Sequence, residues 1–295
     1  MKKTGHGKTL NSFFLSPFLL SLLFSCASLS LQSAPEELTP RWETFAPGID
    51  YFAGRTGKPR LELWALRVDL CNPDLEFVVN GDGPEPIPST TVTKFVKDYD
   101  CIAGINTTPF DPASAVIGED RVISGITISG GIIVSAPQPR FDALVFYNDG
   151  SAAILSQADL DAEALETIHN AVGGFFIILQ DGAIPERFQA TRHGQPVRHP
   201  RSAAGLSADG KTLYLLAIDG RRSESVGATE KETGIILKRL GADDGLNFDG
   251  GGSTALVLRY PDGRIGPVNT PTHGRISGKE RSVATCLGIR ILNEP

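Results

Sequence analysis

The sequence predicts an α+β protein, with a mixed or mainly antiparallel β-sheet core and a few helices packed against it. Asp-Gly turn signals recur between short apolar runs, as at 149–150, 209–210 and 262–263, and such turns join antiparallel strands. Apolar residues at helical spacing occur in only a few short segments. The helix-then-strand passage over 229–248 allows one local parallel crossover. Hairpins with few helices are typical of the α+β class.

The expected elements of the first third follow from local apolar patterns. Alternation predicts strands over 61–70 and 74–79, and helical spacing predicts a short amphipathic helix over 91–99. An apolar run over 102–105 then enters the sheet and ends at Asn106.

From residue 115 to 183 the pattern is mostly β, with one helix expected over 162–169. Short strands are expected over 122–123, 126–128, 132–134, 143–147, 152–155 and 175–179. A hairpin follows over 206–218, and a capping box over 229–232 starts a helix that ends at Gly241. Strands over 256–259 and 283–291 complete the sheet.

The first 25 residues have the pattern of a secretory signal peptide. Lysines precede an apolar run over 13–24 that is too short and too interrupted for a good membrane span. The four residues that end at Cys26 are similar to a bacterial lipobox, with Cys26 lipidated; simple cleavage nearby is the alternative. Residues 26–58 predict a tether followed by the segment that enters the fold, and 59–295 predict one domain. We expect an exported, membrane-anchored lipoprotein of the bacterial periplasm or cell surface, with no other membrane contact.

Charge and cysteine content narrow the function classes. The chain has a formal net charge of −6, and its first 25 residues contribute three positive charges, so the remainder is more acidic still. Such a surface is a poor match for nucleic acid. Cys71, Cys101 and Cys286 each lie in or beside an apolar run, which favours buried free thiols. A Cys71–Cys101 bridge is the alternative in an exported protein.

The stretch 243–256 is the strongest candidate in the sequence for a functional site. An alternating segment ends at Asp249, and three glycines, two hydroxyl residues and a second apolar run follow. A carboxylate beside bare amides and hydroxyls would make a donor-rich site for phosphate or a sugar oxyanion. A plain hairpin turn is the alternative. The stretch is not a P-loop, because no lysine follows the glycines at the required spacing.

A basic segment over 187–201 stands out in this acidic chain. Its cations are Arg187, Arg192, His193, Arg198, His199 and Arg201. The segment is either a solvated loop or an anion-facing loop beside a cleft.

The glycine-rich stretch resembles the signature of the phosphodiester glycosidase family, and three other segments support this. They resemble its Arg-Thr-Ala-x-Gly strand start, its hydrophobic-Asp-Gly-Arg strand end and its closing Glu-Arg-x-Val. The segments are His199-Pro200-Arg201-Ser202-Ala203-Ala204-Gly205, Ala217-Ile218-Asp219-Gly220-Arg221 and Glu280-Arg281-Ser282-Val283. The resemblance extends over roughly residues 60–291. In the segment that resembles the family's Asn-Gly-Gly-x-Phe, Thr107 and Thr108 replace the glycines after Asn106.

The resemblance implies cleavage of a sugar C1–O–phosphate linkage. A site for that reaction must bind the phosphate charge and place a carboxylate at the oxocarbenium-like centre. It must also supply a proton or a positive charge to the leaving oxygen. We expect Asp249 as the central acid, with Asp219 and Glu280 as the other catalytic candidates. Asp219 could instead orient Arg221 or cap a turn. The expected substrate-binding residues are Arg201 as phosphate clamp, Arg221, Arg281, Gly250, Gly251, Gly252, Ser253, Thr254, Asn106, Gly173 and Gly174.

Several of these residues carry structural alternatives. Asn106 could be a turn residue, and Gly173 and Gly174 could mark a bulge or close strand packing. No cofactor is expected; Asp oxygens would suit a divalent cation, but no spacing indicates a metal site. We expect the motif residues to line one cleft although they are far apart in sequence.

Two functions from different classes follow. The first is an exported hydrolase that cleaves a sugar-1-phosphodiester in an envelope glycan or glycolipid. The second is a non-catalytic surface lipoprotein that binds carbohydrate or phosphate with the same fold. The motif arginines and carboxylates favour the hydrolase, whereas Thr107 and Thr108 favour the binding protein.

Overall fold

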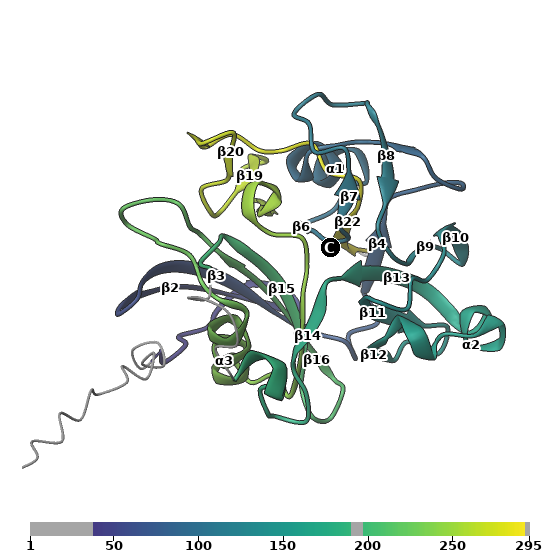
Figure 1. Cartoon of the computed structure of the whole chain (residues 1–295), viewed down its shortest axis with the longest axis horizontal. Coiled ribbons are helices and arrows are strands. Elements are labelled where there is room, and N and C mark those ends of the chain that lie inside the picture. Colours follow the sequence, from purple (N-terminus) through teal and green to yellow (C-terminus); the bar gives the residue numbers. More distant parts are fainter. Residues whose placement is uncertain (1–37, 190–196, 293–295) are drawn as a thin grey trace, which may run out of the picture. The chain divides into compact units, whose positions relative to one another are not determined.

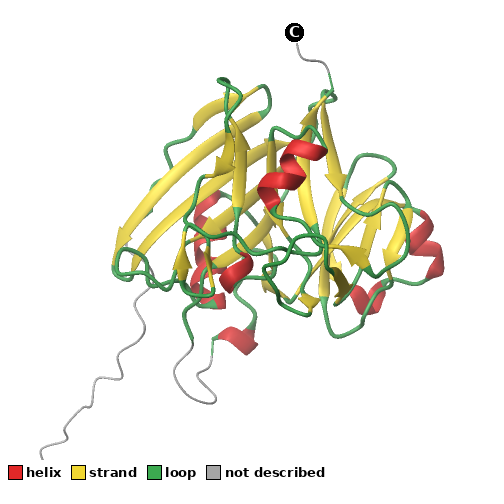
Figure 2. Cartoon of the chain, turned by 90° about the horizontal axis from the view of Figure 1, so that it is seen from above, coloured by secondary structure: helices red, strands yellow, loops and turns green. Residues whose placement is uncertain are grey.

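The computed structural model describes residues 38–189 and 197–292 (Figure 1). The expected signal peptide, the lipidation of Cys26 and the first part of the tether lie outside the described residues. Strands, drawn in yellow in Figure 2, are far more abundant than helices. The named strands pair antiparallel throughout the described residues, which confirms the predicted α+β class. None of the described helices is long and apolar enough to cross a membrane.

Three larger sheets and two small ones contain the strands. The seven-stranded sheet has the order β1-β2-β3-β16-β15-β17-β14, with β1 Glu43–Ala46, β2 Ile49–Gly57, β3 Arg60–Asp69, β14 Phe176–Leu179, β15 Arg201–Leu206, β16 Thr212–Ile218 and β17 Asp244–Asn247. A five-stranded sheet has the order β19-β18-β6-β22-β4, with β4 Leu75–Val79, β6 Ala103–Asn106, β18 Leu256–Arg259, β19 Ile265–Pro267 and β22 Cys286–Ile291. A second five-stranded sheet has the order β10-β9-β13-β11-β12, with β9 Thr127–Ser129, β10 Ile132–Ser135, β11 Asp142–Tyr147, β12 Ala152–Ser156 and β13 Ile168–Gly174.

The small sheets and the helices complete the described chain. The small sheets contain β5 Ile87–Pro88, β7 Phe110–Asp111, β8 Asp120–Ile123, β20 Thr272–His273 and β21 Ile276–Ser277. The α-helices are α1 Val92–Asp98, α2 Ala162–Glu166 and α3 Glu230–Leu240, and the 3₁₀ turns are η1 Gln157–Asp159, η2 Glu186–Phe188 and η3 Gly251–Ser253.

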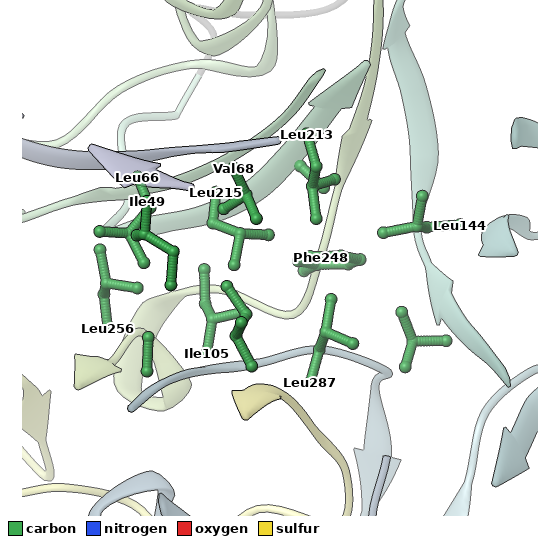
Figure 3. Packing of buried hydrophobic residues seen from close by; sticks show 14 of the residues in the cluster. Ile49, Leu66, Val68, Ile105, Leu144, Leu213, Leu215, Phe248, Leu256 and Leu287 are labelled. Carbon is green, nitrogen blue, oxygen red and sulfur yellow. The ribbon is translucent and has the colours of Figure 1, made fainter. Parts of the chain in front are cut away.

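The sheets pack in layers because each strand alternates its side chains between two faces. On β15, Ala203 faces a cluster with Ile236 and Leu237 of α3, whereas Ala204 belongs to a cluster on the opposite face. That second cluster joins side chains of all three larger sheets around Phe248 (Figure 3). Helix α1 lies on the outer face of the β6–β18–β22 sheet. The packed sheets therefore have α3 on one outer face and α1 on the other.

The predicted helix starts and the crossover are confirmed. Thr229 and Glu232 form a capping box at the start of α3, and Gly241 caps its end at a φ of 117°. Because β16 and β17 both run antiparallel to β15, they share one direction, and α3 crosses between them. The helix expected over 162–169 is shorter, because Ile168 already pairs with β11 as part of β13.

Two expectations about the chain's periphery need correction. The folded part begins before residue 59, because β1 and β2 already belong to the seven-stranded sheet. Glycines and charged residues interrupt the apolar alternation of β2, which is why its sequence does not look like a strand. Cys101 and Cys286 are buried free thiols as predicted, but Cys71 is exposed in the turn after β3, and no Cys71–Cys101 bridge forms.

Candidate active site

The loop that carries Asp249 is held by the buried side chain of Asn106. The Asn106 amide nitrogen donates to the carbonyl of Asp249 at 2.6 Å. Its oxygen accepts from the hydroxyl of Ser202 at 2.6 Å and the amide of Ala255 at 3.1 Å. The amide of Asp249 donates to the carbonyl of Thr107 at 2.8 Å. Asn106 therefore fixes both ends of the glycine-rich loop, and its predicted direct contact with substrate is replaced by this bracing role.

Two of the loop's glycines make room for arginine side chains. Gly251 has a φ of 63°, and a Cβ atom there would lie 2.8 Å from Nη2 of Arg221. A Cβ atom at Gly252 would lie 2.5 Å from Nη2 of Arg281. Any larger residue would displace these guanidinium groups, since real Cβ atoms do not approach so closely. The glycines thus place two positive charges directly against the loop.

The remaining predicted glycines allow close packing. A Cβ atom at Gly250 would lie 2.7 Å from the carbonyl oxygen of Pro200, and one at Gly173 would lie 2.8 Å from the methyl group of Thr108. At Gly174 a Cβ atom would meet a leucine of β17 at 2.7 Å. Close strand packing, the alternative for the glycine pair in β13, is what the structure shows.

The Asp249 carboxyl group lies among donors and positive charges. The Ser253 hydroxyl donates to it, and Arg281 and Arg221 act on it electrostatically. Burial is the largest effect and raises the pKa of Asp249 to about 6, although the hydroxyl and the two arginines oppose this rise. Nη1 of Arg281 also donates to the Ser253 hydroxyl oxygen at 3.2 Å. Ser253 therefore links the carboxyl group to one of the guanidinium groups.

Each of these two arginines contacts a histidine. Nε of Arg281 donates to Nδ1 of His273 at 3.0 Å, and Nη2 of Arg221 lies 3.4 Å from Nδ1 of His199. Burial and the neighbouring arginines lower the pKa of both imidazoles, so they are neutral acceptors at neutral pH. The sequence marks His199 as part of the basic segment and as the start of one motif segment, and no sequence signal marks His273. Each contact depends on how the segment that carries the histidine packs, which no local sequence pattern shows.

The Arg201 guanidinium is already paired in the structure, unlike the free phosphate clamp that the sequence predicts. Arg201 is buried, its guanidinium pairs with Glu230 at 3.0 Å, and its Nε donates to the carbonyl of Ala228 at 2.8 Å. Alternation along β15 sends Ser202 to the Asn106 side and Arg201 to the α3 side. The predicted fork is therefore already occupied at the start of α3.

Asp219 is bonded on both carboxylate oxygens. Oδ1 accepts from the side chain of Asn269 at 3.1 Å and from the amide of Thr270 at 3.0 Å, and Oδ2 pairs with Arg222 at 2.5 Å. Burial raises the pKa of Asp219, and the bonds from Asn269 and Thr270 oppose that rise. The carboxylate anchors the segment after β19, and its charge partner is Arg222 rather than Arg221. This matches the structural alternative better than the catalytic one.

Glu280 is engaged at the start of α1. Its Oε2 accepts from the amide of Thr93 at 3.1 Å and its Oε1 from the Thr93 hydroxyl at 2.5 Å. A carboxylate is favourable there because the first amides of a helix lack partners. Glu280 thus holds the neighbouring Arg281 in place instead of joining Asp249 as a second free carboxylate.

The hydroxyl groups that replace the family's glycines point into the protein. The Thr107 hydroxyl donates to the hydroxyl of Thr285 at 3.0 Å, and the Thr108 hydroxyl accepts from the amide of Gly173 at 2.9 Å. Both threonines are almost fully buried. Thr254 is buried too, and among the described residues its hydroxyl has no hydrogen-bond partner.

The arginines of the basic segment are paired with acids where the structure describes them. Arg187 contacts Asp142 at 3.4 Å, and Arg198 pairs with Glu232 at 2.5 Å. Arg192 and His193 lie outside the described residues. Of the described basic residues in this segment, His199 is the one that contacts a site arginine. Within ranges 38–189 and 197–292 no group of three His, Cys, Asp or Glu side chains could hold a metal ion.

Comparisons with known proteins show the family and the fold of the chain. A family model described as phosphodiester glycosidase matches residues 99–290. The SPbeta prophage-derived uncharacterized protein YomE of Bacillus subtilis (strain 168) is 30% identical over 147 residues, which are 47% of this chain and 22% of that protein. The chain therefore spans about a fifth of the length of this curated relative.

Two solved structures share the fold. A crystal structure of a hypothetical protein from Synechocystis has a TM-score of 0.63 at 14% identity, with 86% of this chain and 64% of that chain covered. The catalytic domain of zebrafish N-acetylglucosamine-1-phosphodiester alpha-N-acetylglucosaminidase, auto-inhibited by its pro-peptide, has a TM-score of 0.62 at 20% identity, with 86% and 88% covered. The family model covers more than half of the chain and includes Asp249, Arg221 and Arg281. The chain belongs to the phosphodiester glycosidase family, a family of hydrolases.

Proposed function

We propose that this protein is an exported hydrolase that cleaves the C1–O–phosphate linkage of a sugar-1-phosphodiester in an envelope glycan or glycolipid. One observation carries the proposal. The Asp249 carboxyl group lies beside two guanidinium groups, those of Arg221 and Arg281, on a loop whose glycines leave room for them. Family membership and the likeness to the zebrafish enzyme's catalytic domain support it.

The charges suit a phosphate leaving group. When the C1–O bond breaks, the bond electrons stay on the phosphate oxygen, water supplies the hydroxyl group that ends on C1, and the remaining proton of that water passes to solvent. A phosphate monoester carries this charge without protonation if cations stabilise it, and arginine forks bind phosphate oxygens well. Ordinary glycosides need a second carboxyl group as acid. Because Asp219 and Glu280 are engaged elsewhere, Asp249 is the one predicted carboxylate left for the sugar centre.

In this reaction Asp249 acts on the sugar side and must be ionised. A pKa of about 6 leaves most of its carboxyl groups charged at neutral pH. The Ser253 hydroxyl holds the carboxylate in place, and Arg221 and Arg281 hold the phosphate.

A non-catalytic carbohydrate- or phosphate-binding surface lipoprotein is the second candidate. The observation that favours it is the replacement of two family glycines by Thr107 and Thr108, whose hydroxyl groups bond inward. Such a protein would keep the two site arginines as a phosphate site without turnover.

Turnover of a chromogenic α-N-acetylglucosaminyl phosphodiester separates the two. The hydrolase proposal predicts release of the chromophore by the wild-type protein and its near absence in Asp249→Asn. Asp262→Asn, a change in the turn after β18, is the matched control and should keep full activity. Binding of the phosphodiester by folded protein without turnover would support the binding protein instead.

A further inference from the structure

A cavity of about 530 Å³ lies at the end of β18 that is farther from Asp249. Its lining residues come from four separate segments: Phe45, Asp100, Ile102, Arg259, Tyr260, Pro261, Gly263, Ile291 and Leu292. Ala255, at the near end, bonds the side chain that braces the active-site loop. With a rise of about 3.3 Å per strand residue, the Tyr260 side lies on the order of 15 Å away from Ala255. The cavity is therefore separate from the candidate active site.

One wall of the cavity is a fixed pair of opposite charges. Nη2 of Arg259 lies 2.8 Å from Oδ1 of Asp100, and Nε donates to the carbonyl of Cys101 at 3.0 Å. Nη2 also donates to the carbonyl of Val96 at 3.3 Å. Asp100 is held in the left-handed region, with a φ of 52°, and its side chain is 85% exposed. Within the described chain the hydrogen bonds of Arg259 use Nε and Nη2, so Nη1 is left as a donor beside an accessible carboxylate.

Another wall is aromatic and aliphatic. Tyr260 and Phe45 meet edge to face, with ring centroids 6.5 Å apart and planes at 88°. Tyr260 begins a tight turn closed by its bonds with Arg264 and Gly263, and the Arg264 guanidinium stacks on the ring at 5.0 Å. Ile102 and Ile291 extend this surface. Rigid aromatic rings bind apolar groups at a low cost in conformational entropy.

We propose that this cavity is a second carbohydrate site, which binds a pyranose unit of a neutral glycan. One sugar hydroxyl donates to the Asp100 carboxylate, its neighbour accepts from Nη1 of Arg259, and the C–H groups of the ring contact Tyr260 and Phe45. The cavity combines fixed polar groups with one aromatic and aliphatic wall, and a pyranose presents both hydroxyl groups and C–H groups to such a surface. The exposed carboxylate disfavours binding of an anion, and the charged pair disfavours binding of a purely apolar ligand. The site would hold a glycan while the reaction proceeds elsewhere, but it does not depend on the proposed hydrolysis.

Isothermal titration of the full chain with maltotriose, cellotriose and triacetylchitotriose tests the proposal. At least one trisaccharide should bind, and Asp100→Asn should weaken that binding about tenfold, since it removes a charge-assisted bond. Asparagine tolerates the left-handed backbone, so the variant should fold normally. Tyr260→Ala should abolish binding. Asp262→Asn, in the same turn but outside the lining, and Asp249→Asn, in the active site, should both bind like the wild type.

Two results would overturn the second site. One is the failure of all three trisaccharides to bind to wild-type protein. The other is binding that survives Asp100→Asn and Tyr260→Ala but is lost in Asp249→Asn, because the sugar would then occupy the active site. Hydrolysis of the small chromogenic phosphodiester should be unchanged in Asp100→Asn, so failure of this proposal is distinguishable from failure of the proposed reaction.

Discussion

Two strands of the seven-stranded sheet are followed by similar sequences, but the aspartates in these sequences have different bonding partners. β16 ends at Ile218 and is followed by Asp219-Gly220, and β17 is followed by Phe248-Asp249-Gly250. Both aspartates follow buried apolar residues. They lie at the same end of the neighbouring strands, because Arg201 and Ala203 of β15 pair with Ile218 and Asn247.

The partners of the two carboxylates decide their roles. Donors from a neighbouring segment and from Arg222 fill both oxygens of Asp219. Asp249 faces the Ser253 hydroxyl and the charges of Arg221 and Arg281. A similar local pattern therefore produces a carboxylate bonded to a neighbouring segment at one strand end and a carboxyl group beside two guanidinium groups at the other. The contacts from distant segments, rather than the motif, make this difference.

The largest expected effect is the loss of turnover in Asp249→Asn. Removal of a positioned acid or nucleophile typically costs roughly 10²-fold or more in rate, and we expect this loss in kcat. Steady-state kinetics on the chromogenic phosphodiester would measure it. Full activity in the purified, folded variant would remove Asp249 from the mechanism.

The same variant should not lose stability at neutral pH. The pKa of Asp249 is raised from 3.8 to about 6 because burial disfavours its charged form. Above pH 6 this charged form lowers the free energy of unfolding by at most about 3 kcal/mol. That cost falls as pH decreases from 6 and vanishes below about 4, where both states are protonated. Thermal unfolding of Asp249→Asn and wild type should show an advantage for the variant that is largest above pH 6, decreases between pH 6 and 4, and is absent below about pH 4.

Substitution of the site arginines should act mainly on binding. Arg281→Lys and Arg221→Lys keep the charge but lose the planar fork, so KM should rise about 10- to 100-fold with a smaller change in kcat. Arg201→Lys is the matched control, because the Arg201 guanidinium is occupied by Glu230. Kinetics in which Arg201→Lys raises KM more than the other two would restore Arg201 as the phosphate clamp.

Asp219→Asn should lower stability more than activity. An amide nitrogen in place of either oxygen would face a donor, from Thr270 or from Arg222. The expected loss is about 1–3 kcal/mol in the free energy of unfolding, measured by denaturant titration, with kcat within about tenfold of wild type. A rate loss equal to that of Asp249→Asn, without loss of stability, would show that the two strand ends share the chemistry.

The smallest expected effect is at His273. In His273→Ala the Nε of Arg281 loses its acceptor at 3.0 Å, and we expect a rise in KM of roughly twofold to tenfold. His273→Gln, whose side-chain oxygen is also an acceptor, should recover part of this loss. Equal KM values in both variants and wild type would mean that the imidazole does not position the arginine.

Much of the fold was predictable, because it depends on local patterns. Alternation and Asp-Gly turns located β3 and the β15–β16 hairpin, and the capping box with Gly241 located α3. β1 and β2 were missed because their alternation is irregular, and their membership in the sheet depends on pairing with β3.

The site was only partly predictable for the same physical reason. The glycine-rich stretch correctly marked the loop at Asp249, since glycines are needed where guanidinium groups come close. The motif could not show that Arg201 pairs with Glu230 at the start of α3, or that Glu280 accepts from Thr93 at the start of α1. His273 lies in a short hairpin, and its contact with Arg281 depends on the packing of that hairpin.

The pH dependence of kcat/KM on the glycosyl phosphodiester tests the central claim most directly. The claim is that Asp249 acts ionised and that no protonated carboxyl group assists the phosphate leaving group. The account predicts that kcat/KM rises through an apparent pKa near 6, the pKa of Asp249 in the folded protein, and then stays level through neutral pH. A decline as pH rises above 6 would contradict it, because Asp249 would then act as the proton donor.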